Sequence, residues 1–100
     1  MTLRIGIIGV GRWGKRYVKT CLGMTDVTIT WLCSTTQETL KKCVEEIPPA
    51  GKIRTTTKYT HILADPTVDA VIIATPGTTQ YTIAQDAIIA GKHVLVEKPL

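Results

Sequence analysis

The sequence lacks the features that would assign it to a membrane, secreted or metal-binding class. No apolar run is long enough to cross a membrane, and residues 1–4 lead straight into an apolar segment instead of a signal peptide. The three cysteines, Cys21, Cys33 and Cys43, are odd in number and lack the C-x-x-C spacing of a metal or redox site. We therefore expect buried, reduced thiols in a cytoplasmic protein, with no metal site and no membrane partner.

Acidic residues are fewer than basic ones, which bears on binding partners. Twelve lysines and arginines against eight acidic residues give a formal net charge of +4. Four basic residues, Arg12, Lys15, Arg16 and Lys19, lie close together. No RNA-binding run of basic and aromatic residues and no zinc-finger spacing accompanies them, so we expect no nucleic-acid partner. They indicate either attraction for a phosphate group at the start of a helix or a solvated helix face.

Short β-branched segments alternate with segments of helical spacing along the whole chain. Strands are expected at 3–8, 27–33, 52–56, 69–76 and 93–97. Helices are expected at 12–22 and at 60–64. Another helix is expected to run from a cap at Thr35 to residue 47, with Glu38 completing a capping box. The last helix is expected to run from a cap at Thr78 or Thr79 to Gly91. The alternation predicts an α/β fold, a doubly wound parallel sheet of the Rossmann type. We expect one domain over 1–100, truncated after the fifth strand.

A G-x-G-x-x-G pattern stands between the first expected strand and the first helix. Gly9 permits a tight turn, Gly11 lets a pyrophosphate approach the backbone, and Gly14 lets helix and strand pack closely. The helix beginning near Arg12 directs unpaired N–H groups toward the anion. Trp13 either covers the pyrophosphate or packs on the sheet. The pattern predicts dinucleotide binding, and the alternative is a glycine-rich turn without a ligand.

The end of the second expected strand bears on which dinucleotide binds. An acidic residue there would bind the two ribose hydroxyls of NAD. The sequence has Ser34 and Thr35 instead, and no carboxylate to repel a 2′-phosphate, which favours NADP over NAD. No arginine stands beside them, and Thr35 is also explained as a helix cap. Thr75 and Pro76 follow the fourth strand, across the point where the strand order reverses and a ligand crevice forms.

The second half of the chain resembles a known family. The segments 65–76 and 90–99 are similar to the Gfo/Idh/MocA family, the relatives of glucose–fructose oxidoreductase and inositol dehydrogenase. The most specific element is the triplet at 97–99, Glu-Lys-Pro, after a Gly-Lys-His-Val strand. The resemblance covers almost the whole chain. It implies the N-terminal NAD(P)-binding domain of an oxidoreductase that acts on a sugar or polyol-like small molecule by hydride transfer.

The resemblance also implies residue roles. The residues implied to surround the pyrophosphate are Gly9, Gly11, Arg12, Trp13 and Gly14. Thr75 and Pro76 would line the cofactor crevice, and Glu97 would lie beside the nicotinamide. Lys98 would be the catalytic residue that binds the substrate and orients its reacting hydroxyl.

Two departures from the family leave questions open. Gly77 and Gln80 stand where the family often has asparagine and histidine. The family's second domain, with acid–base residues, substrate pocket and oligomer interface, is expected to be absent. A non-catalytic module that binds a nucleotide or coenzyme A is therefore the alternative function. We expect self-association, through the second domain in a full-length protein or through the exposed edge of 93–97 in this chain.

Overall fold

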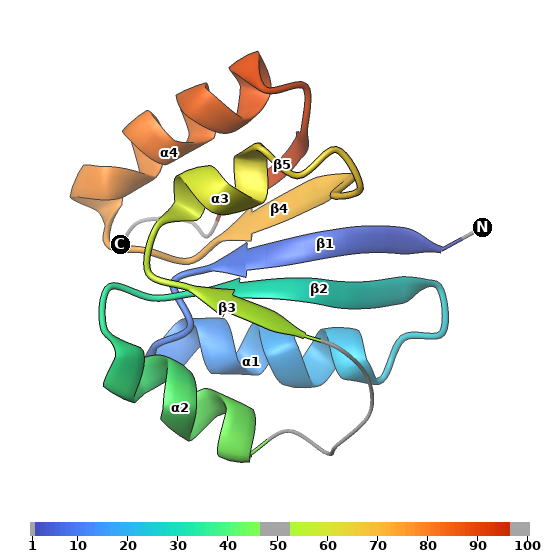
Figure 1. Ribbon diagram of the computed structural model, residues 1–100, viewed down its shortest axis with the longest axis vertical. Coiled ribbons are helices and arrows are strands. Elements are labelled where there is room, and N and C mark those ends of the chain that lie inside the picture. Colours follow the sequence, from blue (N-terminus) through green and yellow to red (C-terminus); the bar gives the residue numbers. More distant parts are fainter. Residues whose placement is uncertain (1, 47–52, 97–100) are drawn as a thin grey trace.

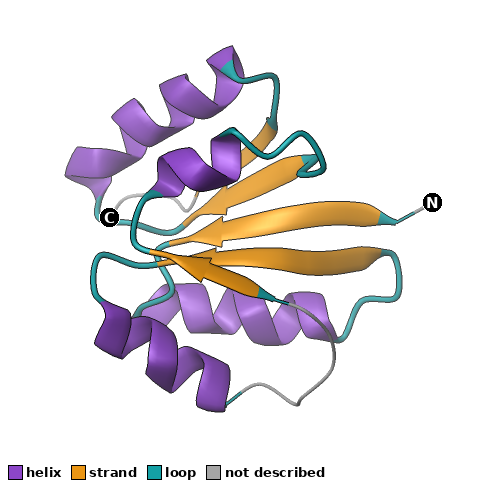
Figure 2. Ribbon diagram, viewed as in Figure 1, coloured by secondary structure: helices purple, strands orange, loops and turns teal. Residues whose placement is uncertain are grey.

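Five parallel strands form one sheet in the order β3-β2-β1-β4-β5 in this computed structural model, which describes residues 2–46 and 53–96. Along the chain the elements are β1 (Leu3–Ile8), α1 (Arg12–Leu22), β2 (Val27–Cys33), α2 (Gln37–Glu45), β3 (Arg54–Thr56), α3 (Tyr59–Leu63), β4 (Ala70–Ile73), α4 (Gly77–Ile89) and β5 (His93–Val96). Helices α1 and α2 cover one face of the sheet, and α3 and α4 cover the other (Figure 1; Figure 2). The predicted doubly wound Rossmann arrangement is confirmed.

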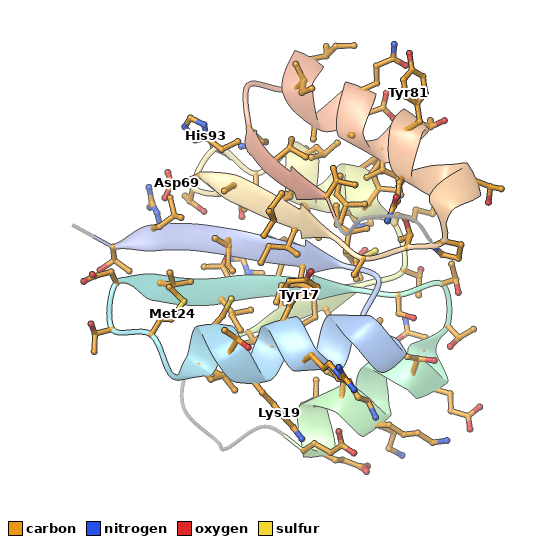
Figure 3. All side chains as sticks on the ribbon, turned by 180° about the vertical axis from the view of Figure 1, so that it is seen from behind. Tyr17, Lys19, Met24, Asp69, Tyr81 and His93 are labelled. Carbon is orange, nitrogen blue, oxygen red and sulfur yellow. The ribbon has the colours of Figure 1, made fainter. Side chains whose placement is uncertain are left out.

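Each face of the sheet has its own core, because strands buried on both sides place alternate residues under different helices. The core under α1 and α2 contains Ile5, Ile7, Val10, Val18, Cys21, Ile29, Leu32, Leu40, Cys43 and Ile72. The core under α3 and α4 contains Ile8, Cys33, Ile62, Val68, Val71, Ile73, Ile83 and Ala87. Tyr17 of α1 points toward the sheet and packs against the first core (Figure 3).

A bulge in β2 adjusts which residues reach each core. The pairing of β2 with β1 skips Thr30, whose hydroxyl donates to the Ile5 carbonyl at 3.2 Å. Because of this extra residue, Ile29 and Leu32 both face α1 and α2, although an uninterrupted strand would place them on opposite faces. The bulge therefore buries Leu32 in the first core and turns Cys33 into the second.

The structure corrects two predicted helix caps. Helix α2 is capped by Thr36, not Thr35, and the Thr36 Oγ1 accepts a hydrogen bond from the Thr39 N–H at 3.3 Å. The reason is that Ser34 still donates its N–H to β3, so the chain stays extended for longer than the capping pattern indicates. Neither Thr78 nor Thr79 caps α4, which begins directly after Pro76.

The three cysteines are buried and free, as predicted. Burial raises the pKa of the Cys33 thiol to about 11, so this thiol stays protonated near neutral pH. Among the helices of the described residues, none has the length and apolar character needed to cross a bilayer.

Candidate functional site

The carboxyl ends of the five parallel strands meet at one edge of the sheet, and the glycine turn lies at its centre (Figure 1). On one side, the N–H groups of Gly9 and Val10 both donate to the Cys33 carbonyl, at 2.8 and 3.2 Å. On the other side, the Ala74 N–H donates to the Ile8 carbonyl at 2.8 Å. These bonds bring the end of β2 and the end of β4 to the two flanks of the turn. A ligand crevice is expected at such a reversal of strand order.

Two of the three glycines are required by the backbone itself. Gly9 has φ +94°, and a β-carbon there would lie 2.9 Å from the backbone and side chain of Thr75. A β-carbon on Gly14 would collide with the carbonyl oxygen of Gly9. Any side chain at either position would therefore push the turn away from β4 or lift α1 from the sheet.

Gly11 differs from the other two glycines. Its φ is −76°, a value that any residue adopts, and no atom of the described residues lies within 4 Å of where its β-carbon would stand. No contact in the described fold requires a glycine here. The open space over Gly11 is what the close approach of a pyrophosphate to the backbone needs.

The start of α1 presents unpaired donors at the same place. Gly11 is the N-cap of α1 and has no side chain to accept a hydrogen bond, while its carbonyl accepts from the Lys15 N–H at 3.0 Å. The first-turn N–H groups of a helix have no partner within the helix, and they carry its positive dipole end. No acidic residue occurs in this first turn. The turn is therefore suited to bind an anion.

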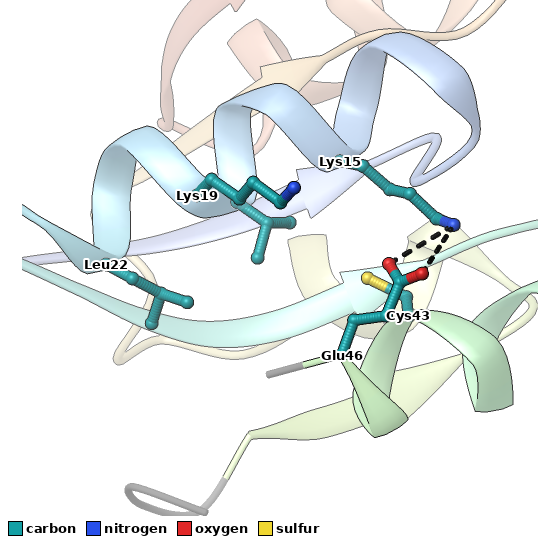
Figure 4. A pocket seen from close by; sticks show the side chains of 6 residues that line it. Lys15, Lys19, Leu22, Cys43 and Glu46 are labelled. Atoms are coloured by element: carbon teal, nitrogen blue, oxygen red, sulfur yellow. Dashed lines mark hydrogen bonds and ion pairs between the residues drawn. The ribbon is translucent and has the colours of Figure 1, made fainter. Parts of the chain in front are cut away.

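Two of the basic residues near the turn have a different role from phosphate binding. The Lys15 ammonium lies 3.3 Å from a carboxylate oxygen of Glu46 at the end of α2. Lys15 and Lys19 line a small cavity of about 20 Å³ between α1 and α2, with Cys43 and Glu46 on the other wall (Figure 4). The sequence allowed either phosphate binding or a helix face for the basic residues, and the positions of these two lysines fit the helix face.

Thr75 flanks the glycine turn on the β4 side and carries an unsatisfied group. Its Oγ1 is buried, yet it has no hydrogen-bond partner in the described parts of the chain. Most buried hydroxyls have a partner, so an orphan beside an open turn indicates a ligand atom. Pro76 and Gly77, which follow, are exposed, and Gln80 is buried one turn into α4.

Ser34 flanks the turn on the β2 side. It is 9% exposed, its N–H donates to the Thr56 carbonyl at 3.3 Å, and its hydroxyl makes no hydrogen bond with the described residues. Thr35, the next residue, is exposed. The site thus offers open backbone at Gly11, helix N–H groups and two free hydroxyls on opposite flanks, which fits an extended dinucleotide.

Residues 3–100 match the model of an oxidoreductase family with an NAD-binding Rossmann fold. The chain belongs to the Gfo/Idh/MocA oxidoreductase family. The family description agrees with the α/β fold of this chain and gives it an NAD-binding Rossmann domain. The resemblance inferred from the sequence is confirmed.

Three relatives illustrate the range of the family. An α-N-acetylgalactosaminidase of Shewanella oneidensis is 33% identical over 98% of this chain and 23% of its own length. The scyllo-inositol dehydrogenase of Lactobacillus casei, solved with NAD(H) and scyllo-inositol, is 26% identical with a TM-score of 0.86 over 98% of this chain and 28% of its own. The biliverdin reductase of Synechocystis sp., solved with NADP⁺ and biliverdin, is 28% identical with a TM-score of 0.86, over 98% and 30%. The chain thus spans about a quarter of the length of these relatives.

Some residues of the family pattern lie outside the described structure. These are Glu97 and Lys98, and the side chains of Arg12 and Trp13. The sequence did not indicate that Thr56, the last residue of β3, would lie beside the end of β2. No local motif marks this residue, because it reaches the end of β2 only through the pairing of β3 with β2.

Proposed function

We propose that this chain is the cofactor-binding part of an enzyme that transfers a hydride between a nicotinamide and a sugar or polyol-like small molecule. The observation that carries the proposal is the open backbone at Gly11, placed at the N-terminus of α1 beside the orphaned Thr75 hydroxyl. When bound, the nicotinamide supplies or accepts the hydride. The cytoplasm, where nucleotide cofactors and reduced thiols coexist, is the proposed location.

The chain's own residues bind and orient the cofactor. The first-turn N–H groups of α1, at Arg12, Trp13 and Gly14, hold the pyrophosphate. The Thr75 hydroxyl gains the partner that it lacks, and Pro76 lines the crevice beside it. These contacts fix the reactive end of the dinucleotide toward β4 and β5.

Glu97 and Lys98 carry the proposed chemistry by similarity to the family. Glu97 lies beside the nicotinamide, and Lys98 donates a hydrogen bond to the reacting hydroxyl or carbonyl of the substrate. In an enzyme that contains this domain, Lys98→Met is expected to lower kcat by about 100-fold, because an oriented, charged donor is lost. The dissociation constant of the cofactor should stay unchanged, and a parallel loss of cofactor binding would contradict the role.

NADP is the proposed preferred cofactor. Ser34 and Thr35 present hydroxyls where a carboxylate would exclude the 2′-phosphate. Isothermal titration of this chain with NADP and NAD tests the preference directly. Ser34→Asp is expected to reverse it, because the carboxylate would bind the ribose hydroxyls of NAD and repel the phosphate. Tighter binding of NAD to the unaltered chain would disprove the preference, and binding of coenzyme A alone would disprove the function.

Net hydrolysis of a glycoside is a second candidate, favoured by the sequence identity to an α-N-acetylgalactosaminidase. Some glycosidases depend on NAD and do not use the common carboxylate pair. The two functions differ in their cofactor balance. A hydrolase would release sugar from a nitrophenyl glycoside without net change in nicotinamide absorbance, whereas an oxidoreductase would show that change with each turnover.

A second copy of this chain is the proposed macromolecular partner. Within the described sheet, β5 pairs with β4 along one side only, and Leu95 is 54% and Val96 39% exposed. The complement of unpaired N–H and C=O groups on a strand is another strand edge. The opposite edge strand, β3, is short and polar, so β5 is the edge that we expect to pair with a second chain.

Sedimentation velocity at several concentrations tests the pairing. We expect a dimer that dissociates on dilution, and a monomer for Leu95→Lys. Ile88→Lys, at an exposed apolar position on α4, is the control and should leave the dimer intact. A monomer at every concentration, or equal disruption by both variants, would contradict the proposal.

A further inference from the structure

We propose that Lys58, at the end of β3, supplies the positive charge that binds the 2′-phosphate of NADP and is a specificity-determining residue of this site. The inference rests on the proposed binding of NADP. It answers a question raised by the sequence, which has no arginine beside Ser34 and Thr35 to bind such a phosphate.

The pairing of β2 with β3 places Lys58 near the end of β2. Cys33 pairs with Thr56, and the hydrogen bond from the Ser34 N–H to the Thr56 carbonyl extends the pairing by one residue. Lys58 follows Thr56 by two residues. The carboxyl ends of β2 and β3 therefore lie side by side (Figure 1), although Ser34 and Lys58 are 24 positions apart in the sequence.

Thr56 holds the backbone of Lys58 in place. The Thr56 Oγ1 accepts from the Lys58 N–H at 3.0 Å and donates to the Lys58 carbonyl at 3.2 Å. The same hydroxyl lies 2.7 Å from the Nδ1 of His61. Thr56 itself is only 6% exposed. The start of the Lys58 side chain is thus positioned by a buried anchor, while the residue itself is exposed.

The ammonium of Lys58 is available for a ligand. Three other basic residues are engaged: Lys15 with Glu46, Lys42 with Glu38, and Arg54 with both the Trp31 ring and Asp65. Lys58 forms no ion pair with any residue in 2–46 or 53–96, and no acidic residue stands at the ends of β2 and β3.

The chemistry of the neighbouring groups suits a phosphate monoester. The Ser34 hydroxyl is free to donate to a phosphate oxygen, and the lysine supplies a compact positive charge. A charge-assisted hydrogen bond of this kind is about twice as strong as a neutral one. Because NAD has a hydroxyl in place of the phosphate, the lysine discriminates between the two cofactors.

Titrations of the chain with four nucleotides test the inference. The probes are NADP, NAD, and the adenosine halves 2′,5′-ADP and 5′-AMP. Lys58→Ala is expected to raise the dissociation constants of NADP and 2′,5′-ADP by about tenfold. The dissociation constants of NAD and 5′-AMP should change by less than about twofold. Lys58→Glu should weaken the binding of these two 2′-phosphorylated nucleotides further, and Lys58→Arg should restore their binding. Lys41→Ala, an exposed lysine on α2, is the matched control and should change nothing.

The outcomes separate this inference from the proposed function. Equal weakening of NAD and NADP by Lys58→Ala, or no weakening of either, would overturn the role of Lys58 while leaving dinucleotide binding intact. A wild-type chain that binds NAD but not NADP would overturn it as well. Failure of the wild-type chain to bind any of the four nucleotides would instead overturn the proposed function, and this inference with it.

Discussion

The two ends of the sheet differ in how completely their polar groups are paired. At the end where the strands begin, the Asp69 carboxylate accepts from the Arg4 N–H at 2.8 Å and from its guanidinium at 3.4 Å. The Lys92 ammonium donates to the carbonyls of Asp65 and Val68 at 2.7 and 2.8 Å. Figure 3 shows Asp69 close to this amino edge, on the side of the sheet where His93 begins β5.

The opposite end leaves polar groups open. The Thr75 Oγ1 is buried without a partner among the described residues, the Ser34 hydroxyl is free, and the backbone at Gly11 is uncovered. Pairing at the amino edge stabilises the fold, whereas open groups at the carboxyl edge are available to a ligand. The comparison predicts that substitutions at the two ends affect different measurements.

The largest loss of stability is expected at Gly14, a residue of the glycine turn that the fold itself also requires. Gly14→Ala should lower the free energy of unfolding by about 3 kcal/mol, because the new methyl group collides with the Gly9 carbonyl oxygen. Urea denaturation followed by circular dichroism measures this. A variant as stable as the wild type would show that α1 can move away from the turn at little cost.

Gly11→Ala should separate binding from stability at the carboxyl edge. The free energy of unfolding is expected to fall far less than in Gly14→Ala, since φ is negative and no described atom would contact the new methyl group. The dissociation constant for NADP should rise by about tenfold or more, because the methyl group occupies the pyrophosphate position. Loss of stability with normal binding by the folded fraction would make Gly11 a structural residue.

Lys92→Met is the matching test at the amino edge. Two carbonyls would lose a charged donor, so the free energy of unfolding should fall by about 2 kcal/mol. Binding of NADP should not change, because Lys92 lies at the far end of the sheet. Lys41→Met provides the control for removal of a lysine from the surface. An altered nucleotide affinity in Lys92→Met would show that the two edges are coupled.

Acid pH is expected to lower the free energy of unfolding by a smaller amount, through the carboxyl group of Asp65 at the amino edge. Hydrogen bonds from the Trp31 indole, at 2.9 Å, and from Thr67 lower the pKa of Asp65 to about 2. Because the folded-state pKa lies below the unfolded value near 3.8, the contribution is complete above that value and is lost as pH falls toward 2. It amounts to about 1–2 kcal/mol. Trp31→Phe should raise the pKa of Asp65, as measured by NMR titration of its carboxyl group.

Local patterns in the sequence were sufficient for the strands, most helices and the glycine turn. The segment at 3–8, for example, is apolar at nearly every position, which is a property of a central strand and is visible without its neighbours. The turn is likewise local, because Gly9, Gly11 and Gly14 act through backbone atoms a few residues apart. The resemblance to the family came from contiguous segments for the same reason.

Only the tertiary structure decided which distant groups meet. The bulge at Thr30 and the cap at Thr36 depend on how β2 pairs with β1 and β3, and no property of those threonines alone determines the pairing. The proximity of Lys58 to the end of β2 and the engagement of Lys15 by Glu46 also join residues more than 20 positions apart. Such contacts depend on strand order and helix packing, which are set by burial of the whole core and not by local propensity.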